Sequence, residues 1–471
     1  MYMAGEWVDG RERDEVLNPY DGDVVDTVPR ATAADAERAV GAAVLAAARM
    51  RWLTAYERAE IVTRAADLLA ERAEDIAETM TREQGKPLAE ALAEARRTPA
   101  LVRLAASEAA RMHGETIPLD ATAGAGDKMG FTLRQPCGVV VAITPFNYPL
   151  LLVAHKVGPA LASGNAVILK PAGQTPLTAL KLTEAFLDAG LPEDALQTLT
   201  GPGGELGPAL CADPRVRKIS FTGSTEVGEG IARVAGVKRL SLELGSNCPM
   251  VVLPDADVER VAAATALGGY ANAGQACISV QRVLVDRAVY GDYLDALRPQ
   301  VEAIRVGDPL EEGTGLAALI TEGEAERVER TIRDAVECGA SLVTGGERER
   351  GVVSPAVVAD VSPDMAISRD ELFGPAVAVT PVSGIDEGIA LANDSRYGLG
   401  AGIFTRDVTH ALRFAREVDC GNIQINSTPL WRADLMGYGG LKGSGIGKEG
   451  PRYAIEEMTE LKSVVFHGVP R

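Results

Sequence analysis

The first third of the chain has the apolar spacing of helices. Between residues 32 and 113, apolar side chains recur at threes and fours among alanine, glutamate and arginine, which predicts amphipathic helices. Thr32 with Asp35 and Thr54 with Glu57 have the spacing of capping boxes at two helix starts. The segment 81–87 is expected to separate two of these helices.

From residue 139 the pattern changes to short apolar runs that alternate with helical segments. The expected elements of this set are 139–143, 150–161, 166–169, 178–189, 195–200, 218–221, 224–235 and 239–243. Strand and helix in regular turn imply right-handed crossovers. The pattern therefore predicts an α/β fold with a parallel, doubly wound sheet.

A second alternating set extends from the strand 250–253 to about residue 425, which is enough for a second α/β domain. The glycine-rich segment 121–130, with the residues after it to 136, is expected to form an exposed ribbon. The residues 459–467 are expected to form one extended strand near the end of the chain.

Composition excludes several classes of function. The 471 residues, 46% hydrophobic and 24% charged, suit a globular protein of two or three domains. A formal net charge of −19 argues against nucleic acid or an anionic membrane as a partner. The six cysteines form no C-x-x-C pair or Cys/His cluster, and there are only four histidines, so we expect no metal site.

The location of the protein is expected from what the sequence lacks. The first residues show no basic region followed by an apolar core, so we expect no secretory signal. The most apolar region, 138–169, is interrupted by prolines and polar residues and is not expected to span a membrane. With dispersed thiols, these features predict a cytoplasmic protein.

Cys277 is the candidate nucleophile, between Gly274 and the apolar run 283–285. A thiol is the best ordinary side-chain nucleophile near neutral pH when its surroundings favour the thiolate. A cysteine among apolar residues is more often packing than chemistry. Other residues must therefore decide the role of Cys277.

Several expected strands end in residues suited to chemistry. Asn147 lies between two prolines, where its amide could donate to a developing oxyanion. Lys170 ends a strand, at the edge where ligands of open α/β sheets lie. Gly223 and Ser224 form a strand-to-helix turn suited to phosphate. Glu243 ends an apolar strand, where burial would raise its pKa as a general base requires.

Each of these residues taken alone also has an ordinary structural explanation as a turn, a solvated charge or a satisfied buried side chain. The ordered set is far more specific. It comprises TPFNYP, ILKPA, FTGSTEVG, LELG, GQACIS, ELFGP, NDSRYGL, GNIQIN and GYGGLKGSG. In this order, over nearly the whole chain, these motifs resemble the NAD(P)-dependent aldehyde dehydrogenase superfamily.

The resemblance implies a covalent mechanism. Cys277 would be the nucleophile, and Asn147 with the backbone N–H of Cys277 would stabilise the thiohemiacetal oxyanion. Glu243 would activate the water that hydrolyses the thioester. Because CoA-acylating members lack this glutamate, its presence favours release of a free carboxylic acid.

The resemblance also implies a nicotinamide cofactor. Lys170 and Glu371 would hold its ribose hydroxyls, Gly223 and Ser224 would lie at the pyrophosphate, and Phe373 would border the nicotinamide ribose. Many NAD-preferring members carry a glutamate where this chain has Gly173. Loss of that carboxylate permits a 2′-phosphate, so the expected cofactor is NAD or NADP.

Basic residues near the expected substrate tunnel suggest a small polar or anionic aldehyde. These are Arg103, His155 and Arg432, and the chain looks most like the lactaldehyde and phosphonoacetaldehyde branch. Phosphonoacetaldehyde members tend to carry arginine where this chain has Ala276. The arginines could instead form surface ion pairs, and His155 could be a satisfied helix histidine. A semialdehyde dehydrogenase and a silent ligand-binding homologue are the alternatives.

The resemblance further implies three structural parts. Residues 1–118 and 137–245 would form the nucleotide-binding domain, and 246–455 the catalytic domain. Residues 119–136 and 456–471 would form a β-strand oligomerisation arm. Because an exposed strand edge favours pairing, the expected assembly is a homodimer or homotetramer.

Overall fold

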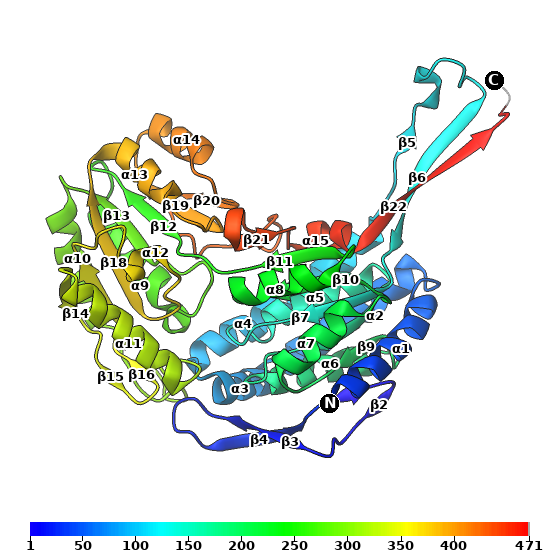
Figure 1. Ribbon diagram of the computed structural model, residues 1–471, viewed down its shortest axis with the longest axis horizontal. Helices are drawn as coiled ribbons and strands as arrows, with labels where there is room; N and C mark the ends of the chain where they lie inside the picture. Colours follow the sequence, from blue (N-terminus) through cyan, green and yellow to red (C-terminus); the bar gives the residue numbers. More distant parts are fainter. Residues whose placement is uncertain (470–471) are drawn as a thin grey trace.

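The computed structural model describes residues 1–469 and shows two sheet-centred bodies and a projecting arm (Figure 1). The mixed α/β class predicted from the sequence is confirmed. No helix among residues 1–469 is long and apolar enough to cross a membrane.

The first body is built on an eight-stranded sheet with the order β2-β1-β9-β8-β7-β10-β11-β21. The strands from β9 to β11 run parallel, and β1, β2 and β21 add antiparallel edges. The bounds are β1 (Tyr2–Met3), β2 (Glu6–Trp7), β7 (Val139–Ile143), β8 (Ala166–Lys170), β9 (Leu196–Thr198), β10 (Val216–Thr222), β11 (Arg239–Glu243) and β21 (Gly445–Ile446).

Helices surround this sheet and bury its apolar strands. They are α1 (Ala33–Met50), α2 (Ala55–Glu71), α3 (Ala73–Gln84), α4 (Leu88–Ala110), α5 (Leu151–Ala162), α6 (Pro176–Asp188), α7 (Gly203–Ala212), α8 (Thr225–Ala235) and α15 (Pro451–Glu457). Both predicted capping boxes form, with Thr32 and Asp35 at α1 and with Thr54 and Glu57 at α2. A short hairpin of β3 (Arg13–Leu17) and β4 (Val24–Pro29) lies outside the sheet.

The second body contains a seven-stranded sheet with the order β14-β17-β18-β13-β12-β19-β20. In β12, Met250 and Val252 belong to one apolar cluster, while Val251 belongs to another. Alternating side chains are thus buried on both faces, as in other sheets covered on both sides. The strands are β12 (Pro249–Val252), β13 (Arg282–Asp286), β14 (Ser341–Thr344), β17 (Ala356–Ala359), β18 (Ala376–Val382), β19 (Gly400–Phe404) and β20 (Asn422–Ile425).

The helices of this body complete its two apolar layers. They are α9 (Val258–Tyr270), α10 (Tyr290–Glu302), α11 (Glu322–Glu337), α12 (Ala366–Arg369), α13 (Gly384–Asn393) and α14 (Val408–Glu417). A small ribbon of β15 (Arg348–Glu349) and β16 (Val352–Val353) lies beside α11. The second alternating set predicted from the sequence therefore forms an α/β body of its own.

The arm is a three-stranded antiparallel sheet of β5 (Thr116–Ile117), β6 (Lys128–Pro136) and β22 (Thr459–His467). It extends well clear of the main body (Figure 1). All nine residues of β22 pair with β6, so segments far apart in sequence share one ribbon. Two residues of the predicted arm, 470 and 471, lie outside the described residues.

The three-part division stays a prediction, and the topology bears on where its parts meet. Before residue 455 the chain has already returned to the first body, because β21 pairs with β11. Helix α15 likewise packs on α4 and α5. The segment 445–457 thus connects the second body, the first body and the arm.

Candidate active site

Parallel strands bring the predicted site residues of the first body to one edge of its sheet. Asn147 follows β7, Lys170 ends β8, Gly223 follows β10 and Glu243 ends β11. Because these strands are hydrogen-bonded neighbours, their carboxyl ends lie side by side. Cys277 reaches this edge from the second body, on the turn that follows α9.

A strained turn presents Cys277. Asn272, Ala273 and Gly274 take consecutive left-handed conformations, with φ of 51°, 53° and 72°. A Cβ on Gly274 would lie 2.1 Å from the carbonyl oxygen of Gly374, so only glycine fits there. Left-handed non-glycine residues are costly and cluster at functional sites. The geometry of this turn therefore supports a functional reading of the cysteine.

The Cys277 thiol remains partly accessible and contacts a tyrosine. Its Sγ lies 3.0 Å from the hydroxyl of Tyr438. Burial raises the pKa of the Cys277 thiol to about 12, although the Tyr438 hydrogen bond acts to lower it. A second thiol, Cys248, donates to the backbone carbonyl of Cys277 at 3.4 Å. Burial thus favours the protonated form of this thiol.

Asn147 is held against the turn that carries the nucleophile. Its Nδ2 donates to the carbonyl oxygen of Gln275 at 2.7 Å, and its own carbonyl accepts from Asn272 Nδ2 at 2.9 Å. An amide nitrogen has two protons, so one remains for an incoming oxyanion. The structure therefore brings Asn147 and Cys277 together, as the sequence predicts.

A buried ion pair supports this arrangement from the helical layer, and sequence reasoning missed it. Lys86 Nζ donates to Glu94 at 2.7 Å and to the carbonyl of Asn147 at 2.7 Å. Glu94 also accepts the backbone N–H groups of Leu150 and Leu151 at the start of α5. The prediction that 81–87 separates two helices is only partly right, because residues 81–84 end α3 and only 85–87 connect it to α4. The signal that could have found the ion pair is a lysine between a glycine and a proline in this short connection.

Glu243 is the unpaired carboxyl of the site. Neither of its oxygens has a hydrogen-bond partner among residues 1–469. Burial raises the pKa of Glu243 well above its usual value, and the neighbouring Glu449 raises it further. Burial also acts to raise the pKa of Glu449, but Lys156 and Arg432 outweigh it and lower that pKa to about 2. Glu449 therefore stays ionised, and Glu243 is the carboxyl poised to exchange a proton.

Lys170 and Glu371 lie at the sheet edge with capacity for a ligand. Lys170 donates to the carbonyl of Pro171 at 2.8 Å, and burial lowers its pKa to about 8. Within residues 1–469 the Pro171 carbonyl is the hydrogen-bond acceptor of its Nζ and no ion pair forms, so the ammonium keeps donors for a ligand. Glu371 accepts from the Ser246 backbone at 2.9 Å, and burial raises its pKa to about 7.

The two glycines near these residues differ in the space beside them. A Cβ at Gly173 would meet nothing within 4 Å, whereas one at Gly223 would lie 2.5 Å from the ring of Phe221. Ser224 caps α8 and accepts from Val227 N–H at 3.4 Å. Phe373 has a φ of 51° and packs edge-on against Phe146. Free N–H groups at a helix start and hydroxyl-binding side chains nearby fit a dinucleotide.

Arg432 and His155 lie together beside Tyr438. Arg432 places its guanidinium carbon 3.8 Å from the Tyr438 ring centroid, and its Nη2 lies 3.4 Å from His155 Nδ1 and 3.3 Å from a Glu449 carboxylate oxygen. Burial lowers the pKa of His155 well below its usual value, and the Arg432 charge adds to this. Arg432 Nε and His155 Nε2 have no hydrogen-bond partner within residues 1–469.

Arg103 is not brought to this cluster. It forms an exposed ion pair with Asp67 on α2 at 2.6 Å, as the surface alternative predicted. The arginine of α4 that reaches the substrate loop is Arg97, which donates to the carbonyl of Arg432 and to Asp434. Six helical residues separate the two positions, so their side chains point in different directions. Sequence reasoning missed Arg97 because both arginines lie on one helix and the sequence does not show which of them faces the loop.

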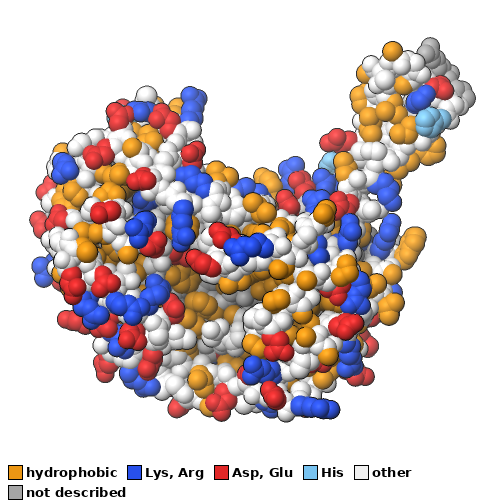
Figure 2. Space-filling view, viewed as in Figure 1, with side chains coloured by type: hydrophobic (Ala, Val, Ile, Leu, Met, Phe, Trp, Pro, Cys, Tyr) orange, Lys and Arg blue, Asp and Glu red, His pale blue; other side chains and the backbone are white. Residues whose placement is uncertain are grey.

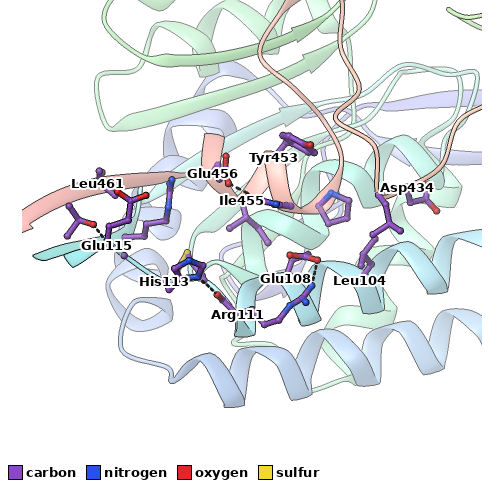
Figure 3. Close-up of a pocket in the computed structure, with 17 residues that line it drawn as sticks. Leu104, Glu108, Arg111, His113, Glu115, Asp434, Tyr453, Ile455, Glu456 and Leu461 are labelled. Carbon is purple, nitrogen blue, oxygen red and sulfur yellow. Dashed lines mark hydrogen bonds and ion pairs between the residues drawn. The ribbon is translucent and has the colours of Figure 1, made fainter. Parts of the chain in front are cut away.

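A separate cavity of about 730 Å³ lies where the arm leaves the body (Figure 3). Glu108 of α4, Tyr453 and Glu456 of α15 and Leu461 of β22 line it. Asp434 joins it to the loop that carries Arg432. Cys277 is not among its lining residues. No group of three or more potential metal ligands occurs within the part of the chain described.

The chain is similar in sequence to known proteins over nearly its whole length. The aldehyde dehydrogenase family profile matches residues 7–464. The chain is 44% identical over 467 residues to 3-sulfolactaldehyde dehydrogenase of Priestia aryabhattai, covering 99% of this chain and 98% of the relative. It is 36% identical to lactaldehyde dehydrogenase of Methanococcus aeolicus, covering 99% and 100%.

The fold is also similar to that of a solved structure. The NADP-dependent glyceraldehyde-3-phosphate dehydrogenase of Bacillus halodurans, complexed with NADP, superposes with a TM-score of 0.97 at 35% identity. The similarity covers 99% of each chain.

Proposed function

This chain belongs to the aldehyde dehydrogenase family, and on that basis we propose that it oxidises a small anionic aldehyde to its carboxylic acid with NAD or NADP. The observation that carries the substrate class is the buried Nε of Arg432, which has no hydrogen-bond partner within residues 1–469, on a side chain that packs against Tyr438. Buried polar groups without partners are rare, and a ligand anion would satisfy this one.

Cys277 starts the reaction by attack of its sulfur on the aldehyde carbon. Asn147 donates its free amide proton to the oxygen that becomes negative, as an oxyanion hole requires. The bound nicotinamide supplies the hydride acceptor for the oxidation step. Glu243 then takes a proton from the water that attacks the Cys277 thioester, and its raised pKa makes it a stronger base than an exposed carboxylate.

The cofactor would rest at the carboxyl edge of the first sheet. Lys170 and Glu371 would bind its ribose hydroxyls, and the start of α8 at Ser224 would face the pyrophosphate. Open space at Gly173 admits either a 2′-hydroxyl or a 2′-phosphate. Both NAD and NADP are therefore accepted in this proposal.

The relatives support an anionic substrate. The names of two similar proteins, 3-sulfolactaldehyde dehydrogenase and glyceraldehyde-3-phosphate dehydrogenase, describe aldehydes that carry a sulfonate or a phosphate. Arg432 offers an Nε donor for such a group, although its Nη2 already contacts Glu449 and His155. Lactaldehyde, named for a third relative, is the neutral alternative. Two further alternatives are a semialdehyde dehydrogenase and a catalytically silent homologue that only binds a ligand.

The arm supports the proposed homodimer or homotetramer. Apolar side chains gather on it (Figure 2), and the exposed ones are Met129, Leu133, Leu461, Val465 and Phe466. An apolar strand ribbon with a free edge favours pairing with another copy. We also propose a cytoplasmic location, which agrees with six cysteines that form no disulfide within residues 1–469. Sedimentation equilibrium of the purified chain tests the assembly.

The deciding experiment measures NADH and NADPH formation at 340 nm without CoA, over pairs of short aldehydes that differ in one anionic group. Wild type is compared with Arg432→Ala and Cys277→Ala, and Arg103→Ala serves as an exposed arginine control. We expect a higher kcat/KM for the anionic member of each pair and loss of that advantage in Arg432→Ala only. Preference for the neutral members would refute the substrate class, and activity in Cys277→Ala would refute the mechanism.

A further inference from the structure

Tyr438 is fixed with its hydroxyl against the proposed nucleophile. The side chain is buried, and its backbone pairs with that of Glu449 in both directions. The guanidinium of Arg432 covers one face of the ring at 3.8 Å. Within residues 1–469, the hydroxyl has one hydrogen-bond partner, the Sγ of Cys277 at 3.0 Å. The tyrosine is therefore aimed at the sulfur by contacts on several sides.

The phenol is suited to donate rather than to accept. Burial raises the pKa of Tyr438 well above 10, so the phenol keeps its proton throughout the working range. The positive guanidinium of Arg432 lies over the face of the Tyr438 ring and is attracted by the partial negative charge of that face. A thiolate is a much better acceptor than a thiol, because hydrogen bonds to ionised groups are stronger. The contact therefore favours the charged form of the sulfur.

We propose that Tyr438 is a catalytic residue whose hydroxyl donates to the Cys277 sulfur and stabilises the thiolate that attacks the aldehyde. The inference rests on the proposed function, which names Cys277 as the nucleophile. It adds to Asn147 and Glu243 a residue that acts before either, at formation of the nucleophile. Without this donor, burial, Cys248 and Glu243 would oppose ionisation of the thiol and only the Arg432 charge would favour it.

The expected size follows from the loss of one hydrogen bond to a charged sulfur. Such a bond shifts a pKa by about one to two units. A lower pKa also reduces the nucleophilicity of each thiolate, with a Brønsted coefficient of about 0.4–0.5. The two effects partly cancel. Removal of the hydroxyl should therefore slow reaction of Cys277 about threefold to tenfold at a fixed pH below its pKa.

Other groups near the sulfur contribute to any pH profile and must be separated from Tyr438. The titratable and charged groups that act on Cys277 are Tyr438, Cys248, Glu243 and Arg432, and Tyr148 is also coupled to it. Comparison of two variants that differ only in the Tyr438 hydroxyl holds the others constant. Repeating it with Glu243→Gln removes the nearest titrating carboxylate from the profile.

The test is alkylation of the full-length protein by iodoacetamide, in which a carbon–sulfur bond forms and iodide leaves. Rates are measured from pH 6 to 10, and peptide masses identify the modified cysteine. Wild type is compared with Tyr438→Phe. The control is Tyr453→Phe, a loss of the same group nearby, because Tyr453 packs on Gly437 but its hydroxyl makes no hydrogen bond within residues 1–469.

We expect Tyr438→Phe to slow alkylation of Cys277 about threefold to tenfold at each pH below the pKa of the thiol, with an unchanged thermal midpoint, and Tyr453→Phe to match wild type. An unchanged profile in Tyr438→Phe would overturn the inference, even if the enzyme oxidises aldehydes normally. A lower thermal midpoint in Tyr438→Phe with no slowing of alkylation would show a structural role alone and would overturn it too. Aldehyde oxidation that survives full alkylation of Cys277 would instead refute the proposed function.

Discussion

Replacement of Lys86 by methionine should damage both stability and catalysis, although Lys86 does not touch Cys277 within hydrogen-bond range. Its side chain is fully buried, and Nζ bonds to Glu94 and to the carbonyl of Asn147. The ring of Tyr148 lies 4.3 Å from the same ammonium. Methionine has a similar length but no donor, so Lys86→Met leaves the Glu94 carboxylate without its cation.

The magnitude follows from burial. Breaking a buried pair by removing one partner costs about 3–5 kcal/mol, because an uncompensated charge stays inside the protein. An exposed pair contributes about 0–1 kcal/mol. Lys181 with Asp75 is such an exposed pair on the same body, which makes Lys181→Met the matched control. Oxyanion stabilisation should suffer as well, because the Asn147 carbonyl then keeps only its bond from Asn272 and the residue that carries the oxyanion donor is held less firmly.

Urea unfolding and steady-state kinetics together test this reasoning. We expect Lys86→Met to lower the free energy of unfolding by about 3–5 kcal/mol. Its kcat should fall by at least about tenfold, but by less than the about 10²–10³ that follows loss of a whole oxyanion donor. Glu94→Gln combined with Lys86→Met should lose less than the sum of the single variants, because neither charge then remains alone. A loss in Lys86→Met no greater than in Lys181→Met would refute the argument.

Three further predictions concern the base and the cofactor. Glu243→Gln should retain a first-turnover burst at 340 nm while steady-state turnover falls by about 10²–10⁴, since only deacylation needs the base; loss of the burst would contradict this. Because burial raises the pKa of Glu243 and the ionised form is the base, the steady-state rate should rise with pH through a midpoint well above 4.5. That rise should be absent in Glu243→Gln, and a midpoint near 4.5 would contradict the burial argument. Gly173→Glu should lower kcat/KM for NADP by more than about tenfold relative to NAD, because a carboxylate repels a 2′-phosphate; an equal effect on both cofactors would count against placing Gly173 at the adenosine ribose.

Residues at strand ends were predictable because topology alone places them. Once the pattern indicates neighbouring parallel strands, Lys170 and Glu243 must end at one edge. The turn at Gly274 was also marked in the sequence, since glycine tolerates a left-handed conformation that other residues avoid. These placements need only chain direction and local backbone preference, which a sequence contains.

Side-chain pairings between helices and loops could not be predicted in the same way. Arg97 and Arg103 are chemically identical and share α4, yet one reaches Asp434 and the other Asp67. The choice depends on the rotation of the helix against its neighbours, which periodicity fixes only approximately. The buried contacts of Lys86 could not be predicted either. A lysine is usually exposed, and only the carboxylate and carbonyl of distant segments reveal why this one is buried.

Arg432 connects three parts of the proposed reaction, and this limits what any single substitution can show. Its guanidinium covers the ring of Tyr438, pairs with Glu449 and leaves Nε for a substrate anion. Arg432→Ala would therefore weaken anion binding and also disturb the donor to Cys277 and the carboxylate beside Glu243. Only loss of anion binding discriminates between aldehydes; the other two effects slow neutral and anionic substrates alike. The ratio of kcat/KM values within an aldehyde pair thus isolates substrate recognition, while the neutral member alone reports the damage to the chemical machinery.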